Sequence, residues 1–309
     1  MRPGKISIYL MYATICFIWG STWLAIKLGL DGVPPLVGAG FRFAVAGLLF
    51  LVLIVSQKLS LRLNGASLRL IAMVGVMNFG LSYGCVYWSE LTISSGLASV
   101  LFCVFPFFVA LLAHYWFDLE SLSLKKILGI GFGFAGIVVI YADEIQSSMG
   151  SLRGMLAMFV ATLASSISLV YLKKYGSELN TLVLNFYSMV LGAVLLLLTS
   201  RLLEQGQAIR WSGKNISALL YLAVFGSVVA FTMYFYLLKH LKATQMSFVT
   251  FIYPILALLL GSWFLHERLS RNLAVGAAMV LGGIFISNRA SPAGAVERVK
   301  SGEGDSAGS

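Results

Sequence analysis

Two prolines interrupt apolar stretches of the sequence at matching places. Pro106 lies in LFCVFPFFVALLAHYWF (101–117), and Pro254 lies in FVTFIYPILALLLGSWFL (248–265). A proline lacks an N–H, so within a helix it frees the carbonyl four residues earlier, here that of Phe102 or Thr250. In a bilayer such a carbonyl needs a partner in protein or in a water-lined cavity. The prolines therefore indicate either simple packing kinks or hinges beside a solute pathway.

Polar and aromatic residues form further candidates for a solute site. Ser99 precedes Pro106 by seven residues, and Ser247 precedes Pro254 by the same distance, so two equivalent helix faces could line one space. Hydroxyls, an amide and aromatic rings in apolar surroundings suit a small amphipathic or aromatic solute. Tryptophans that pack between helices or lie at the lipid interface offer an alternative interpretation. The other candidate binding residues are Trp19, Asn78, Tyr83, Ser168 and Tyr234.

Four ionisable residues fall inside apolar stretches, where charge is costly and points to function. They are Lys27, Arg42, Glu90 and His114. Each lies near the expected end of its stretch, so the simpler interpretation is that the side chain snorkels to water. All 12 acidic residues lie at such ends, in loops or in the tail. The absence of a carboxylate at mid-membrane depth argues against carboxylate-based proton antiport.

Other chemistries find little support in the sequence. The three cysteines lie in apolar stretches without a CxxC pair, and the three histidines are dispersed. There is no H-E-x-x-H, G-x-S-x-G or phosphate-binding loop, so we expect no cofactor, no metal and no catalysis. The net charge of +10 comes from Lys and Arg scattered singly or in pairs between apolar stretches. That distribution reflects membrane topology, and we expect no nucleic-acid partner.

The composition places the chain in a lipid bilayer. Of its 309 residues, 59% are hydrophobic and 11% charged, and the mean hydropathy is +0.90. A span needs roughly 20 apolar residues. Ten stretches meet this need, which predicts an all-α membrane protein of ten transmembrane helices at 6–28, 36–56, 68–89, 93–117, 125–142, 152–172, 180–201, 215–238, 243–265 and 272–288.

The distribution of basic residues predicts the orientation of the spans, since cytoplasmic loops carry more Lys and Arg. With the N-terminus inside, the inner segments hold 14 basic residues and the outer segments hold 7, with Arg42 inside a span. Both termini are therefore expected in the cytoplasm. The residues after Arg289 are small and polar, which predicts a disordered cytoplasmic tail at 290–309.

A constant offset of 147 residues relates the two halves of the sequence. It separates Lys27 from Lys174 and Gly136 from Gly283, while the two prolines differ by 148. Five spans per copy is an odd number, so the second copy must enter the membrane upside down. The sequence thus predicts two five-helix inverted repeats, at 1–145 and 146–289. Within them, Glu120 and Glu267 mark equivalent turns, and Ser123 and Ser270 are expected N-caps.

Two segments resemble a known family. Residues 234–286, YFYLLKHLKATQMSFVTFIYPILALLLGSWFLHERLSRNLAVGAAMVLGGIFI, are similar to the second EamA repeat of the drug/metabolite transporter superfamily. WGSTWLAIKLG at 19–29 is similar to the start of the first repeat. The resemblance extends over about residues 8–288. It departs from the family's Gly-Glu-Arg at the ends of the fourth and ninth spans, where this chain has Leu119-Glu120-Ser121 and His266-Glu267-Arg268.

The resemblance implies a ten-helix carrier of the bacterial plasma membrane that exports amino acids or similar small metabolites. It implies a central cavity formed mostly by the first, third, fourth, sixth, eighth and ninth spans, without a bound cofactor. Substrate would contact the seven candidate binding residues, and the two prolines would serve gating. A multidrug, nucleoside or cationic-compound carrier of the same fold is the first alternative. A membrane-embedded enzyme or sensor is an alternative of another class. Because the first span holds no acid, the proton coupling of small four-helix relatives, which carry a glutamate there, is not expected.

Overall fold

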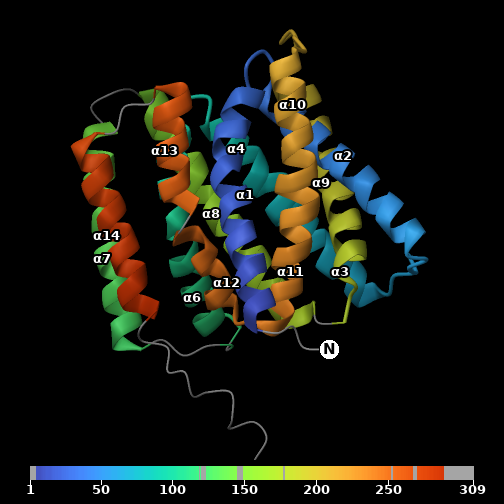
Figure 1. Cartoon of the computed structure of the whole chain (residues 1–309), viewed down its shortest axis with the longest axis horizontal. Coiled ribbons are helices and arrows are strands. Elements are labelled where there is room, and N and C mark those ends of the chain that lie inside the picture. The colour runs from blue at the N-terminus through green and yellow to red at the C-terminus, as the bar shows by residue number, and fades with distance from the viewer. Residues whose placement is uncertain are drawn as a thin grey trace, which may run out of the picture.

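The chain folds into a bundle of long helices that run between two ends of the molecule (Figure 1). The computed structural model describes residues 5–117, 119, 123–144, 149–176, 178–251, 253–266 and 270–288. The expected tail at 290–309 and the turn residues Glu120 and Glu267 lie outside these ranges. The start of α1 and the end of α14 share one end of the bundle, here called the N-terminal end (Figure 1). The opposite end is called the distal end.

All regular structure in the described residues is helical. Six crossings are single helices, namely α1 (Lys5–Gly29), α2 (Pro35–Ser56), α7 (Leu124–Glu144), α8 (Met149–Tyr175), α9 (Thr181–Leu203) and α14 (Arg271–Asn288). Four crossings are composite. They are α3 (Gly65–Met73) with η1 (Val74–Ser82) and α4 (Tyr83–Ser89); α5 (Ser95–Leu101) with η2 (Phe102–Val104) and α6 (Phe105–Tyr115); α10 (Gly213–Tyr221) with η3 (Leu222–Val229) and α11 (Ala230–His240); and α12 (Ala243–Ser247) with η4 (Phe248–Phe251) and α13 (Tyr253–Leu265). These ten crossings confirm the ten predicted spans, and no end differs by more than three residues.

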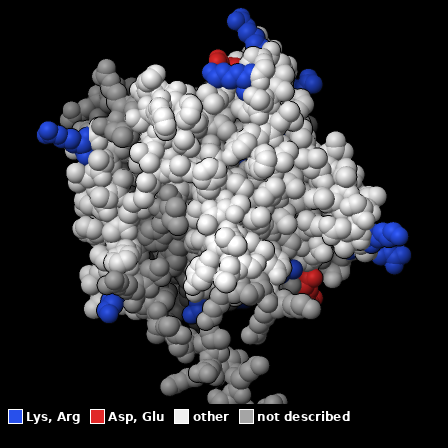
Figure 2. Space-filling view, viewed as in Figure 1, with Lys and Arg blue, Asp and Glu red and all other residues white. Residues whose placement is uncertain are grey.

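The surface of the bundle suits a bilayer. Seven described helical segments are long and apolar enough to cross a membrane, and α13 is a shorter apolar helix. Large apolar side chains such as Leu48, Val52 and Leu198 are exposed on its sides. On the face in Figure 2, Lys and Arg lie near the helix ends and leave the middle of the described surface uncharged. The chain is therefore a multi-pass membrane protein.

Equivalent helices of the two predicted repeats make equivalent packing contacts. Helix α2 packs on its equivalent α9, and α7 packs on its equivalent α14. The contact of α1 with α13 is repeated by that of α8 with α6. The π-helical turns η1 and η3 occupy equivalent places, as do the 3-10 turns η2 and η4. The fold is thus two five-helix inverted repeats related by a pseudo-twofold axis.

The proline-containing crossings meet at that axis. Pro106 and Pro254 lie in the first turns of α6 and α13, directly after the 3-10 turns. The Phe102 carbonyl accepts the Phe105 N–H within η2. The Thr250 carbonyl accepts the thiol of Cys103, with an S–O distance of 3.2 Å and a sequence separation of 147. Both carbonyls that the prolines were expected to free therefore have partners inside the protein.

Side-chain caps fix where several helices begin. The predicted N-cap Ser270 accepts the Leu273 N–H at 3.0 Å and so starts α14. Ser123 directly precedes α7. In α10, Ser212 and Asn215 form a capping box, in which each side chain accepts the other's backbone N–H.

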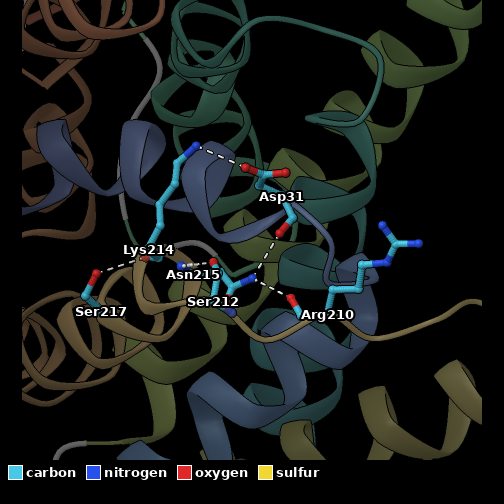
Figure 3. Close-up of polar contacts among 6 residues, drawn as sticks. All are labelled: Asp31, Arg210, Ser212, Lys214, Asn215 and Ser217. Atoms are coloured by element: carbon cyan, nitrogen blue, oxygen red, sulfur yellow. Dashed lines mark hydrogen bonds and ion pairs between the residues drawn. The ribbon is translucent and has the colours of Figure 1, made fainter.

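A polar clasp joins the two repeats at the distal end (Figure 3). The Asn215 Nδ2 donates to the carbonyls of Asp31 and Arg210, both at 2.9 Å. Lys214 pairs with the Asp31 carboxylate at 3.1 Å. The Arg210 N–H donates to the carbonyl of Gly32, which adopts a φ of 84°. The clasp ties the turn between α1 and α2 to the start of α10 in the second repeat.

Two lysines close equivalent turns at opposite ends of the bundle. Lys27 lies in the last turn of α1 and donates to the carbonyls of Glu90 and, at 2.9 Å, Ile93, in the turn between α4 and α5. Lys173, near the end of α8, donates to the carbonyls of Leu238 and Leu241, both at 2.7 Å, between α11 and α12. The two contacts are called the distal and the N-terminal lysine clamp. They correct the sequence pairing of Lys27 with Lys174, since the neighbouring Lys173 makes the equivalent contact.

Replacing Lys173 by methionine is expected to destabilise the protein by about 1–3 kcal/mol, because two helix-end carbonyls lose a charged donor. The same change at Lys174 is the matched control. Lys174 is exposed and reaches the Phe117 carbonyl at 3.3 Å, so its loss should cost under about 0.5 kcal/mol. Thermal unfolding in one detergent compares the two variants. Equal losses for both would show that the N-terminal clamp contributes nothing specific.

Candidate functional site

A cavity that is partly open to solvent lies between the repeats. Its described walls come from the six crossings that the family resemblance implied. The lining residues are Trp19, Thr22, Trp23 and Ile26 of α1; Asn78 and Ser82 of η1; Tyr83 and Val86 of α4; Phe102 and Phe105 of the fourth crossing; Ser165, Ser168, Leu169 and Leu172 of α8; Phe231, Tyr234 and Phe235 of α11; and Met246, Val249, Thr250 and Tyr253 of the ninth crossing.

Aromatic rings form a large part of the cavity wall. The Trp19 ring lies 4.8 Å from the Tyr234 ring and 5.2 Å from the Phe231 ring, centroid to centroid. A second group joins Trp23 to Phe102 at 5.9 Å and to Tyr253 at 5.8 Å. The rings hold one another through edge and tilted contacts, which keeps a large apolar surface in place for a ligand.

A π-helical turn explains the position of Trp19. In η3 the Ser227 hydroxyl donates to the Leu222 carbonyl five residues earlier, at 3.0 Å. The Gly226 carbonyl accepts two side chains from the first repeat. The Trp19 Nε1 and the Arg42 Nη2 each donate to it at 3.3 Å. Local unwinding of this kind provides acceptors for side-chain donors inside an apolar bundle.

Hydroxyl and amide groups supply the polar part of the cavity. The Ser165 hydroxyl donates to the Asn78 Oδ1 at 2.7 Å and links α8 to η1. The Asn78 side chain also carries an amide nitrogen that can donate hydrogen bonds. Ser82, Ser168 and Thr250 add hydroxyls, and Tyr83 and Tyr234 add phenols. None of the described lining residues carries a formal charge. The cavity can therefore hold an apolar body together with a few hydrogen-bonding groups.

The structure brings five of the predicted binding residues together. Trp19, Asn78, Tyr83, Ser168 and Tyr234 all line the cavity. Ser99 does not, since its buried hydroxyl donates to the Gly96 carbonyl at 2.6 Å. Ser247 ends α12, but its side chain lies outside the described part of the chain.

The structure puts the two prolines behind the cavity wall. Both are buried, and neither is among the lining residues. The 3-10 turns that precede them contribute Phe102, Val249 and Thr250 to the cavity wall. Neither proline is therefore placed to contact a solute in the cavity.

Several lining residues were missed by sequence reasoning. Thr22 and Ile26 lie three and seven residues after Trp19, so helical spacing could have identified them. Phe105, Met246 and Tyr253 lie beside the 3-10 turns. These turns change the direction of nearby side chains, and no sequence pattern predicted them.

Arg42 differs most from its expected position. Its side chain does not snorkel to water, because it is 1% exposed and lies among α2, α4 and η3. The other three ionisable candidates behave differently. Lys27 forms the distal clamp, Glu90 is buried at the end of α4, and His114 is half-buried near the end of α6.

The fold and the cavity define the class of the protein. A helical bundle of two inverted repeats with a central cavity at their interface is the architecture of a secondary membrane transporter. The EamA-like transporter family matches this chain twice, at residues 6–142 and 152–289. The chain belongs to the EamA-like transporter family, and it is a membrane transporter of the type found in the drug/metabolite transporter superfamily.

Individual relatives agree with this assignment. "Uncharacterized transporter YoaV" of Bacillus subtilis is 28% identical over 285 residues, which cover 91% of this chain and 97% of YoaV. "Uncharacterized inner membrane transporter YedA" of Escherichia coli is 29% identical over 258 residues, which cover 82% of this chain and 81% of YedA. A solved crystal structure with 18% sequence identity has a TM-score of 0.71 and matches 92% of this chain and 98% of its own. That likeness concerns the fold.

Proposed function

We propose that this transporter exports amino acids or similar small metabolites by alternating access through the central cavity. The observation that carries the proposal is the cavity itself, lined by aromatic rings and hydroxyls from both repeats. Its wall suits a solute with an apolar side chain and a polar end. Trp19, Asn78, Tyr83, Ser168 and Tyr234 are the proposed contacts. Ser99 and Ser247 were predicted with them. In place of Ser99, which does not line the cavity, we propose Ser165 as a contact. Ser247 stays a prediction.

The lysine clamps hold each repeat together as one unit. They close equivalent turns at opposite ends of the bundle, and each turn leads into crossings that line the cavity. Because each clamp lies within a single repeat, one repeat could rock against the other while both clamps stay closed. The proposed cycle therefore has two states, related by the pseudo-twofold axis and open to opposite sides.

The prolines supply a test of gating. Pro106→Ala and Pro254→Ala each restore a backbone donor next to a 3-10 turn, which favours a continuous helix. We expect slower transport with an unchanged thermal midpoint, because the alanine fits the buried site but stiffens the crossing. Initial rates in proteoliposomes measure the effect. Unchanged rates in both variants would leave the prolines as packing kinks only.

The proposed setting is the plasma membrane of a bacterium, with both termini in the cytoplasm. The excess of basic residues in segments at the N-terminal end supports this orientation. The relative YedA is named as an inner membrane transporter, in line with this location. The proposed partners are a small-molecule substrate and the bilayer.

A carrier of organic cations or other drugs is the second candidate. Aromatic rings attract cations at their faces, and the cavity holds several rings without a charged side chain among its described lining. A nucleoside would also find hydroxyl partners there. These substrates differ from amino acids in charge and shape, so one flux experiment separates them.

Flux into proteoliposomes tests the proposed function. Purified protein is reconstituted, and uptake of labelled amino acids, nucleosides and organic cations is compared with uptake by protein-free liposomes. We expect amino acids with apolar side chains to give the highest rates. Uptake of cations alone would favour the second candidate. Absence of uptake for the whole panel would contradict amino-acid export and would favour a membrane-embedded enzyme or sensor.

A further inference from the structure

Arg42 is a buried cation one residue layer behind the cavity. It lies in the second turn of α2, a helix that does not line the cavity, and its side chain is 1% exposed. The Nε donates to the Ser227 hydroxyl at 2.9 Å, the Nη2 to the Gly226 carbonyl at 3.3 Å and the Nη1 to the Tyr87 hydroxyl at 3.5 Å. The guanidinium thus joins α2 to α4 and to the π-helical turn η3.

All of these partners are neutral. Among the described residues, the recorded ion pair is that of Lys214 with Asp31, and Arg42 forms none. The other buried charged side chains belong to helix ends. Glu204 accepts the N–H groups of Leu36 and Val37 at the start of α2, and Glu90 ends α4. A buried charge is costly unless an opposite charge compensates it, so the position of Arg42 needs a reason.

The guanidinium acts on the cavity through two lining residues. Its Cζ lies 4.9 Å from the centroid of the Tyr83 ring, and Tyr83 belongs to the cavity wall. The Gly226 carbonyl, which accepts from Arg42, also accepts from the lining residue Trp19. The described lining itself is uncharged, so the positive charge of Arg42, which contacts the Tyr83 ring from behind, is placed to act on this side of the cavity.

We infer that Arg42 makes the cavity selective for solutes that carry a carboxylate. This inference rests on the proposed function and narrows its substrate class to zwitterions and organic anions. In a protein interior, one unit charge changes the binding of another by about tenfold or more at separations up to about 10 Å. The substrate carboxylate would lie on the Tyr83 side, and the apolar part would lie among the other rings. An organic cation meets repulsion at the same place.

Three related solutes measure this selectivity in proteoliposomes. Phenylalanine is zwitterionic, 3-phenylpropanoate lacks the amine, and phenethylamine lacks the carboxylate. The wild-type protein is expected to transport the two carboxylates at least about tenfold better than the amine, measured as initial rate at low concentration. A wild-type preference for phenethylamine would overturn the inference without any variant. No flux of any of the three would instead contradict the proposed function.

Two variants of Arg42 distinguish the effect of its charge from its structural role. Arg42→Gln removes the charge but keeps hydrogen-bond donors, and it should reduce the carboxylate preference by about tenfold. Arg42→Lys keeps the charge without the planar donor geometry, so it should retain the preference even if the total rate falls. Equal loss of preference in both variants would show that Arg42 only positions η3, and an unchanged preference in Arg42→Gln would also overturn the inference. Thermal midpoints in detergent identify a variant that fails to fold, and the wild-type ratio then decides alone.

Discussion

Replacing Ser168 by phenylalanine is expected to slow transport strongly without unfolding the protein. Ser168 lies on α8 with its side chain at the cavity wall. A phenyl ring there would occupy part of the space between the repeats that the substrate needs. Since the ring enters empty space lined by aromatic residues, the packing of the bundle should change little. We expect a rate at least about tenfold lower and a thermal midpoint close to that of the wild type.

The same substitution at Ser188 is the matched control. Ser188 is a fully buried serine on α9, outside the cavity lining, and its hydroxyl donates to the Ile71 carbonyl at 3.5 Å. A phenylalanine there has no space, so overpacking should cost about 1–3 kcal/mol. The two variants should therefore lose different properties. Full transport by Ser168→Phe would mean that solute does not cross through this cavity.

The second large effect concerns the contact between α7 and α14. A Cβ at Gly283 would lie 2.4 Å from the Gly129 carbonyl oxygen and 2.6 Å from the Gly133 nitrogen. Both atoms belong to the backbone, so no side-chain rotation relieves the clash. Gly283→Ala is expected to destabilise the protein by about 1–3 kcal/mol, because the two helices must separate.

Gly131 on α7 provides the comparison for Gly283. A Cβ at Gly131 meets no atom within 4 Å. Gly131→Ala should therefore be neutral, or stabilising by up to about 1 kcal/mol through helix propensity. Thermal or denaturant unfolding of the two variants in the same detergent gives the difference. If Gly283→Ala is as stable as Gly131→Ala, the close approach of α7 and α14 is wrong.

Hydropathy and repetition allowed most of the fold to be predicted. Apolar length locates a membrane-spanning helix directly, because each backbone polar group must be paired within its own helix. The fourth crossing, predicted at 93–117, is formed by residues 95–115. The offset of 147 residues predicted the inverted repeat because equivalent glycines and charges survive at equivalent turns.

The face that each side chain presents was harder to predict. Adjacent helical residues differ by about 100° in direction, so only one of Lys173 and Lys174 reaches the α11–α12 turn. The 3-10 turn η2 rotates the fourth crossing after Leu101, which is why Phe102 reaches the cavity while Ser99 does not. The burial of Arg42 depends on acceptors that η3 supplies from the other repeat, 184 positions away for Gly226. No local sequence pattern predicts that the Arg42 side chain and the Gly226 carbonyl lie together.

The most direct test of alternating access asks from which side of the membrane a thiol in the cavity can be labelled. Cys16, Cys85 and Cys103 are replaced by serine or alanine, and Ser168→Cys then provides one thiol at the cavity wall. A membrane-impermeant thiol reagent is applied to right-side-out and to inside-out vesicles, with and without transported substrate. We predict labelling from both sides and protection by substrate in both orientations. Labelling from one side only, or labelling that substrate does not slow, would contradict alternating access through the central cavity.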